Sequence, residues 1–150
     1  MPMSLSVLDR VPPSVAFPDQ ALEANLERLD EEFEIYQTTR NRDAIYRFLE
    51  AVFELILWWR HEGMAIHYSR RALWLRGHRP VPKRPEPFAA AIQCTTKVDY
   101  KTRSKWSRVL RYAAEYYSGE CLTKFIKRKG GINRCAARFT RRLGRTKNPR

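Results

Sequence analysis

The sequence predicts an all-α fold: an N-terminal antiparallel helical hairpin, a proline-rich connector and a C-terminal module of three helices. Three observations lead to this prediction. Apolar residues recur at intervals of three and four, the period of a helix, in several segments of the chain. No segment shows the alternation of apolar and polar residues that is typical of a strand. Four prolines within residues 79–87 separate the two groups of predicted helices.

We divide the 150-residue chain into five segments. Residues 1–17 contain three prolines and no periodicity, so we expect an extended arm there. The helical hairpin covers 18–77, the proline-rich connector 78–98, the three-helix module 99–145 and a basic tail 146–150. A chain of this length suits one compact domain, with or without a small appendage.

Two heptad stripes predict the hairpin. The first helix is expected to begin at Pro18, and the second follows Asn41, a predicted N-cap. The stripes consist of Leu22, Leu26, Leu29, Phe33 and Tyr36 in the first helix, and Ile45, Leu49, Val52, Ile56 and Trp59 in the second. The second helix is also apolar outside its stripe, at Phe48, Phe53, Leu55, Leu57 and Trp58. We therefore expect it to have neighbours on two sides, the C-terminal module and either a second copy of the chain or another protein partner.

A third helical stretch is predicted over 64–76, with Gly77 as its C-terminal cap. The prolines that follow exclude a helix or a central strand and predict a semi-rigid extended connector. A plain linker is favoured there over a proline-rich docking motif, and a short helix is allowed at 88–95.

The charge of the chain is strongly polarised. Its 29 Lys and Arg residues and 16 Asp and Glu residues give a net charge of +13. Residues 1–57 carry −6 and residues 58–150 carry +19. Such asymmetry points to a polyanionic partner for the second half, most often nucleic acid. An anionic membrane surface and an acidic protein groove are the competing interpretations.

The C-terminal module is predicted as helices over 102–117, 120–129 and 132–143, with Gly130-Gly131 as a tight turn. In the first of them, Arg108, Arg111 and Glu115 are expected to face away from the apolar stripe. That stripe consists of Trp106, Val109, Leu110, Ala113 and Tyr117. Its aromatic residues, together with Tyr112, are interpreted as core residues rather than as platforms for stacking bases.

The last helix carries the sharpest signal in the sequence. On a helical wheel its five arginines fall within a sector of about 100°: Arg134, Arg138, Arg141, Arg142 and Arg145. The opposite side carries Ile132, Ala136, Phe139 and Leu143. Because like charges at this spacing destabilise an isolated helix, an anionic partner is expected on the arginine face.

A short helix, a glycine-containing turn and a second helix with exposed basic residues resemble the helix-turn-helix arrangement of DNA-binding proteins. The resemblance covers about residues 102–145, and the double glycine departs from the commoner single glycine of that turn. It implies that 132–143 enters the major groove, with Arg134, Arg138 and Arg141 at base edges or flanking phosphates. Asn133 either contacts adenine or caps the helix. Phosphate contacts are expected from Lys124, Lys127, Arg128, Lys129, Lys101, Arg103 and Lys105.

These features predict a small basic nucleic-acid-binding protein, with duplex DNA favoured over RNA. A regulator of transcription or an accessory factor of a mobile element would fit. Two alternatives stay open. One is an RNA-binding or ribonucleoprotein subunit, and the other is an inhibitor or adaptor that docks a basic helix into an acidic or nucleic-acid-binding cleft of a protein.

Other classes of function find no support in the sequence. No catalytic motif and no nucleotide-cradling glycine loop is present, so no enzyme is expected. The three cysteines and three histidines lack metal-ligand spacing, and we expect no metal and no cofactor. No apolar run is long enough to span a membrane, and the N-terminus does not resemble a signal peptide. A cytoplasmic protein, associated with the nucleoid if it binds DNA, is the expectation.

Overall fold

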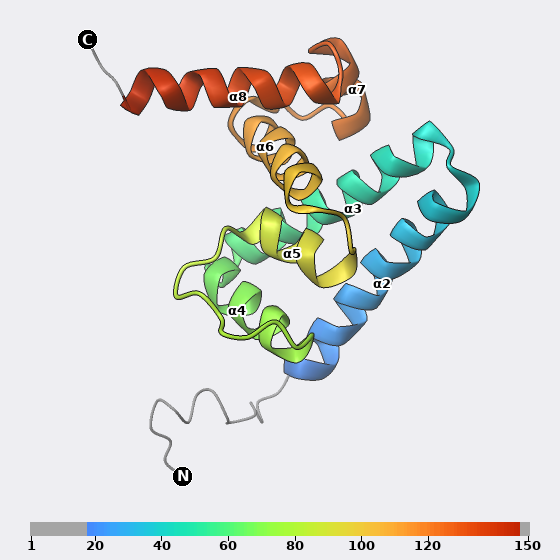
Figure 1. Ribbon diagram of the computed structural model, residues 1–150, viewed down its shortest axis with the longest axis vertical. Coiled ribbons are helices and arrows are strands. Elements are labelled where there is room, and N and C mark those ends of the chain that lie inside the picture. Colours follow the sequence, from blue (N-terminus) through green and yellow to red (C-terminus); the bar gives the residue numbers. More distant parts are fainter. Residues whose placement is uncertain (1–17, 148–150) are drawn as a thin grey trace.

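The computed structural model describes residues 18–147, and side chains are described for 19–143. This part of the chain contains seven helices and no strand, which confirms the predicted all-α class. The helices are α2 (Pro18–Thr39), α3 (Arg42–His61), α4 (Ala65–Leu75), α5 (Pro87–Thr95), α6 (Tyr100–Tyr116), α7 (Leu122–Arg128) and α8 (Ile132–Lys147) (Figure 1). The predicted arm, 1–17, and residues 148–150 of the predicted tail lie outside the described residues.

Helices α2 and α3 pack side by side and are joined by Arg40 and Asn41 (Figure 1). Asn41 caps α3 as predicted, because its side chain accepts a hydrogen bond from the backbone N–H of Asp43 at 2.8 Å. The stripe residues of both helices are buried, except for the half-buried Tyr36. Local periodicity therefore predicted which side of each helix faces the core.

Helix α3 lies at the centre of the molecule and contacts α2, α4, α5, α6 and α7. The predicted contact with the C-terminal helices is confirmed: the ring centroid of Phe48 lies 5.2 Å from that of Phe33 and 6.1 Å from that of Trp106. Phe53 is also buried, whereas Trp58 is 55% exposed. Most of the apolar surface that predicted a second copy of the chain is thus covered within one chain.

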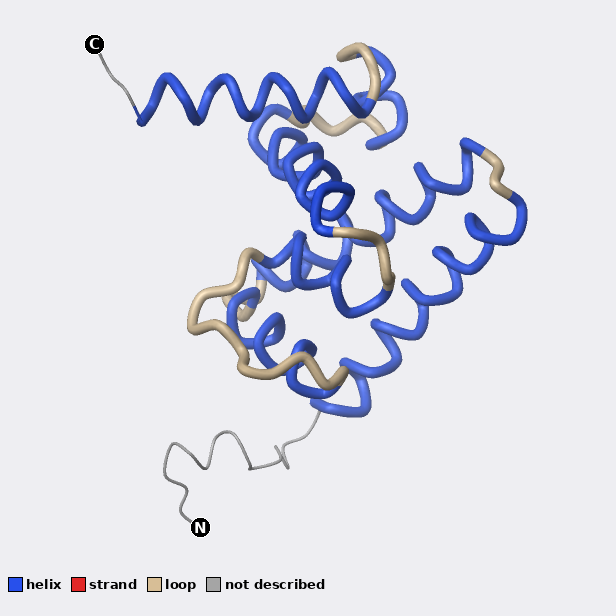
Figure 2. Tube along the Cα trace, viewed as in Figure 1, coloured by secondary structure: helices blue, strands red, loops and turns tan. Residues whose placement is uncertain are grey.

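Helix α5 lies within the predicted connector. Residues 76–86 form the longest loop of residues 18–147 (Figure 2), but α5 then packs between α4 and α6 and also contacts α2 and α3. Phe88, Ala91 and Ile92 are at most 1% exposed. The side chain of Glu86 caps this helix by accepting a hydrogen bond from the N–H of Ala89 at 2.9 Å. The second half of the connector range is therefore a core helix rather than a spacer.

Ion pairs join α2 to α4. Arg71 on α4 donates two hydrogen bonds to the carboxylate of Asp19, at 2.9 and 2.8 Å. Arg76, just beyond α4, pairs with Glu23 at 3.4 Å and with Asp30 at 3.1 Å. Part of the acidic surface of the N-terminal half is thus neutralised by arginines close to it in space.

The exposure of Tyr117 and the length of α8 differ from the prediction. Tyr117 was expected in the buried stripe of α6, but it lies just beyond the helix and is 37% exposed, in edge contact with Phe53. Trp106, Val109, Leu110 and Ala113 are buried as predicted. Helix α8 passes through Gly144, where its end was predicted, and continues to Lys147.

None of the helices in 18–147 has both the length and the hydropathy that a bilayer span requires.

Candidate nucleic-acid interface

Helix α8 lies across α6 at one end of the molecule (Figure 1). Cys135, Ala136 and Phe139 form its buried side and Ile132 and Leu143 are half-buried, which matches the predicted apolar face except that Cys135 was not included there. The hydrophobic contact with α6 thereby fixes which side of α8 is turned outward.

The turn before α8 depends on glycine. The N–H of Gly130 donates to the carbonyl of Lys127 and that of Gly131 to the carbonyl of Ile126, which closes the C-terminus of α7. Gly130 has φ +101°, a conformation that favours glycine. A Cβ atom at this position would lie 2.6 Å from Cδ of Arg134. The side chain of Arg134 therefore crosses directly over the turn.

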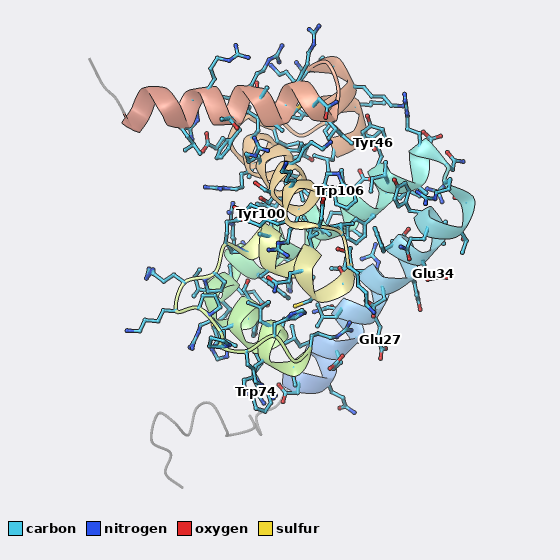
Figure 3. All side chains as sticks on the ribbon, viewed as in Figure 1. Glu27, Glu34, Tyr46, Trp74, Tyr100 and Trp106 are labelled. Atoms are coloured by element: carbon cyan, nitrogen blue, oxygen red, sulfur yellow. The ribbon has the colours of Figure 1, made fainter. Side chains whose placement is uncertain are left out.

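The predicted arginine face divides in the structure. Arg134 and Arg141 are exposed and Arg138 is half-buried, whereas Arg142 is ion-paired with Glu115 of α6. Arg145 lies within α8, and its side chain is outside the described residues. Among the side chains described, no carboxylate comes within 4.0 Å of Arg134, Arg138 or Arg141. We name these three residues the arginine edge. Figure 3 shows nitrogen-tipped side chains projecting outward from α8.

The basic residues of α7 and its ends are only partly available to a ligand. Lys124 is exposed. Lys127 lies 4.0 Å from Asp43 and 5.3 Å from the ring centroid of Tyr46.

Arg128 donates two hydrogen bonds to Glu120. Hydrogen bonds from Ser118 and then from Arg128 lower the pKa of Glu120 to about 2, so this carboxylate is charged at neutral pH. Lys129 lies against the ring of Phe125. Among the predicted phosphate-binding residues Lys124, Lys127, Arg128 and Lys129, Lys124 therefore has the fewest contacts with other side chains of the protein.

A second group of basic residues lies on the first half of α6. Lys101, Lys105 and Arg108 line a hollow of about 340 Å³ together with Tyr100, which is 70% exposed. Arg108 also donates a hydrogen bond to the hydroxyl of Thr140 on α8, so one end of the hollow adjoins α8. The predicted Lys105 and Lys101 thus lie about one and two helical turns before Arg108, the residue of this hollow that contacts α8.

The sequence did not predict that two arginines of α6, Arg108 in this hollow and Arg111 outside it, contact α8. Arg108 was expected to face away from the packed side of α6, yet it contacts α8, and Arg111 likewise lies over the ring of Phe139. The spacing of Lys101, Lys105 and Arg108 by four and three residues was the available signal, because it places them on one side of a helix. Arg103 is turned elsewhere: it lies 5.5 Å from the ring centroid of Tyr100 and lines a different hollow with Glu86.

The electrostatics near the turn are set by burial and by two cations. Burial raises the pKa of the Cys135 thiol, while the charges of Arg138 and Lys129 oppose that rise. Arg138 and Lys129 are themselves half-buried. No group of three or more His, Cys, Asp or Glu side chains that could hold a metal ion occurs in the described part of the chain.

No protein-family model, curated protein or solved structure matches this chain. Its function is therefore inferred from the arrangement of its own residues.

Proposed function

We propose that this protein binds nucleic acid, with duplex DNA as the favoured ligand, through the outward side of α8. The observation that carries the proposal is the arginine edge, whose members have no carboxylate partner among the described side chains. Arginine presents a planar fork of donors that fits phosphate oxygens and the O6 and N7 atoms of guanine. An anionic ligand would also relieve the repulsion between like charges along α8.

We further propose that α7, the glycine turn and α8 act as a helix-turn-helix unit supported from behind by α6. In such units the N-terminal residues of the second helix contact base edges in the major groove. Asn133 and Arg134 lie at this end of α8, and both are exposed. We assign base contacts to these two residues, and phosphate contacts to Arg141, Lys124 and the α6 hollow. Such an activity suits a transcription regulator or an accessory factor of a mobile element.

A salt titration of duplex binding tests this function. Each phosphate contact releases counterions, so the logarithm of the binding constant falls by about 0.9 per contact for each tenfold rise in salt. Changing the arginine edge to glutamine (Arg134→Gln, Arg138→Gln, Arg141→Gln) should weaken binding strongly and make this slope shallower by about one to two units, because Arg141 is assigned a phosphate contact and Arg134 a base contact. Circular dichroism of each variant checks that helix content is retained.

The matched control removes three exposed arginines elsewhere: Arg28→Gln, Arg40→Gln and Arg84→Gln. It lowers the net charge equally, so a comparable loss in the control would mean that overall charge, rather than the arginine edge, attracts the ligand. If the triple change in the edge leaves affinity for both DNA and RNA intact, the proposal is wrong. Tighter binding to RNA than to duplex DNA would select the ribonucleoprotein alternative. Binding only to an acidic protein would select the inhibitor or adaptor.

Self-association is a separate proposal. Helix-turn-helix proteins commonly bind two half-sites as dimers, and Trp58 on α3 leaves 55% of its surface exposed. We propose that a second copy, or a protein partner, covers this residue within the predicted 18–77 region. Light scattering of the parent and of Trp58→Glu should then show a loss of mass in the variant. If the parent protein is a monomer, the proposal of a homodimer is wrong.

A further inference from the structure

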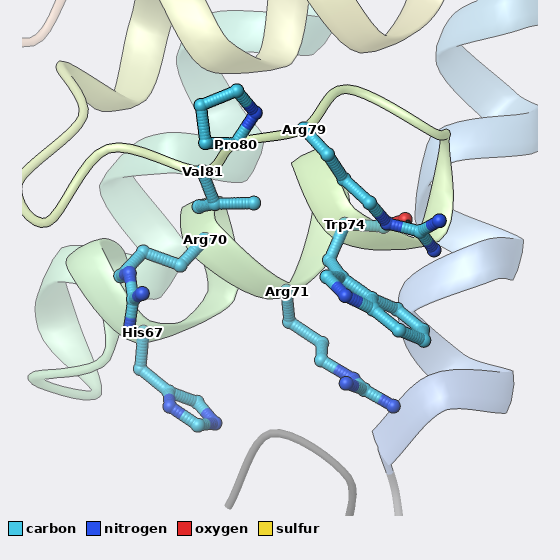
Figure 4. A pocket seen from close by; sticks show the side chains of 7 residues that line it. All are labelled: His67, Arg70, Arg71, Trp74, Arg79, Pro80 and Val81. Carbon is cyan, nitrogen blue, oxygen red and sulfur yellow. Dashed lines mark hydrogen bonds between the residues drawn. The ribbon is translucent and has the colours of Figure 1, made fainter. Parts of the chain in front are cut away.

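A pocket of about 320 Å³ lies far from α8, at the side of α4 and the loop that follows it (Figures 1 and 4). Helix α4 makes no contact with α8 within the described residues. The lining residues are basic, aromatic or apolar: His67, Arg70, Arg71, Trp74, Arg79, Pro80 and Val81. No carboxylate is among those described, although the carboxylate of Asp19 pairs with one of the three arginines, Arg71.

The arginines of this pocket are held in place by contacts within the protein. The guanidinium carbons of Arg71 and Arg79 lie 4.8 and 4.2 Å from the ring centroid of Trp74, and Figure 4 shows Arg79 alongside the indole. Arg79 also donates a hydrogen bond to the carbonyl of Trp74 at 3.2 Å, and Arg70 donates through Nε to the carbonyl of Pro82 at 3.0 Å. Because a guanidinium has five N–H donors, each of these two bonds leaves further donors for a ligand.

The pocket is electropositive at the imidazole of His67. Burial and then the charges of Arg71 and Arg70 lower the pKa of His67, and the charge of Asp19 opposes this effect. A neighbouring hollow shares His67 and Arg70 and adds Arg60 and Lys83. An anion entering the pocket would therefore meet a concentration of positive charge.

We propose that this pocket binds the phosphate group of a phosphate monoester, held by Arg70 and Arg79 with His67 beside it. Pro80 and Val81 offer an apolar wall to the organic part of the ligand. The volume falls at the lower end of the range of small-molecule sites, about 300–1,000 Å³. Since Trp74 already has guanidinium groups against its ring, recognition comes from the phosphate rather than from a stacked base. This inference does not depend on the proposed function of α8.

Nuclear magnetic resonance titrations of the full chain test the proposal. The probes are adenosine 5′-monophosphate, inorganic phosphate and adenosine, followed at the ring of His67 and the indole N–H of Trp74. The two phosphates should shift both signals saturably, whereas adenosine should not. The pKa of His67 should rise when phosphate is bound, because a nearby dianion favours the imidazolium. Saturable binding of adenosine equal to that of its monophosphate would overturn the proposal, as would no shift from either phosphate at millimolar concentration.

Matched variants locate the binding. Arg70→Gln and Arg79→Gln should each weaken binding of the monophosphate by about tenfold or more, because each removes a charge-assisted hydrogen bond. Arg84→Gln is the control, since Arg84 is exposed in the same loop and does not line the pocket. Equal losses in all three variants would refute a specific site. Arg70→Lys keeps the charge but loses the fork, and should bind with intermediate affinity.

Two further experiments are needed. The first distinguishes a nucleic-acid end from a small metabolite as the source of the phosphate, and the second distinguishes binding in this pocket from binding on α8. A 5′-phosphorylated oligonucleotide that binds more tightly at His67 than the monophosphate would identify a nucleic-acid end as the source. Equal or weaker binding would identify a small metabolite. The triple glutamine variant of the arginine edge should keep its affinity for the monophosphate. Loss of that affinity with the fold intact would mean that the phosphate binds on α8, which would overturn the pocket proposal.

Discussion

The guanidinium of Arg142 is ion-paired with the carboxylate of Glu115, and this pair joins α8 to α6. Both residues are only partly exposed, with 34% of the Arg142 side chain and 41% of the Glu115 side chain accessible. Arg142 therefore serves the attachment of α8, while its neighbours Arg138 and Arg141 have no carboxylate within ion-pairing distance among the described side chains. One arginine-rich helix thus contains residues with two different physical roles.

This pairing predicts opposite effects for its two partners. Glu115→Gln removes a negative charge next to α8 and should tighten binding of random duplex about twofold at low salt, an effect that screening reduces at higher salt. Arg142→Gln should instead lower stability by about 0.5–1 kcal/mol, with a smaller loss of affinity than Arg141→Gln. Fluorescence anisotropy and urea unfolding provide the two measurements. Glu34→Gln, an exposed change on α2, is the control. If it tightens binding equally, the effect of Glu115 is only one of net charge.

The carboxylate of Glu120 provides a test of the contacts before α7. Its pKa is held at about 2 against an ordinary value of 4.5, first by Ser118 and then by Arg128. Ser118→Ala and Arg128→Gln should therefore each raise this pKa, because the first removes a hydrogen bond and the second removes both a hydrogen bond and a positive charge. Because the folded-state pKa is depressed, the stabilisation is present above about pH 4.5 and is lost as the pH falls toward 2. Carboxyl chemical shifts during an acid titration measure both effects. An unchanged pKa in both variants would contradict these contacts.

The three cysteines should differ in their reaction with an alkylating reagent. Cys94 and Cys135 are buried, and burial raises the pKa of Cys94 to about 12 and also raises that of Cys135. Cys121 is exposed. Because the thiolate is the reactive species, iodoacetamide at pH 8 should modify Cys121 in the native protein and all three residues in urea. Peptide mass spectrometry identifies the sites. Rapid native modification of Cys135 would show that α8 is not packed against α6 as described.

Arg76 links three parts of the chain, so its removal should be costly. Its guanidinium contacts Glu23 and Asp30 of α2 and donates to the backbone carbonyl of Cys94 at the end of α5. Arg76→Met leaves these acceptors without their donor and should lower the free energy of unfolding by about 1–3 kcal/mol. Arg84→Met, at an exposed position, should change it little. Thermal and urea unfolding measure the difference. Equal stability of the two variants would mean that solvent screens the Arg76 contacts.

Much of the helical framework could be predicted from the sequence because it depends on local chemistry. The heptad stripes of α2 and α3, the Asn41 cap and the apolar side of α8 each follow from residues within one or two helical turns of one another. The arginine edge of α8 could be predicted for the same reason. Periodicity shows which side of a helix is apolar, and therefore which side is turned to solvent when the helix packs.

Contacts between helices cannot be predicted from the periodicity within one helix, and these tertiary contacts decided several features of the structure. They placed α5 in the core, directed Arg142 to Glu115 and Arg108 to Thr140, and exposed Tyr117. They also gathered Arg70 and Arg79 around one pocket, from α4 and from the loop beyond it. The partners in these contacts are separated along the chain by loops and other helices. The identity of a partner depends on how whole helices pack, and no pattern within one helix records that packing.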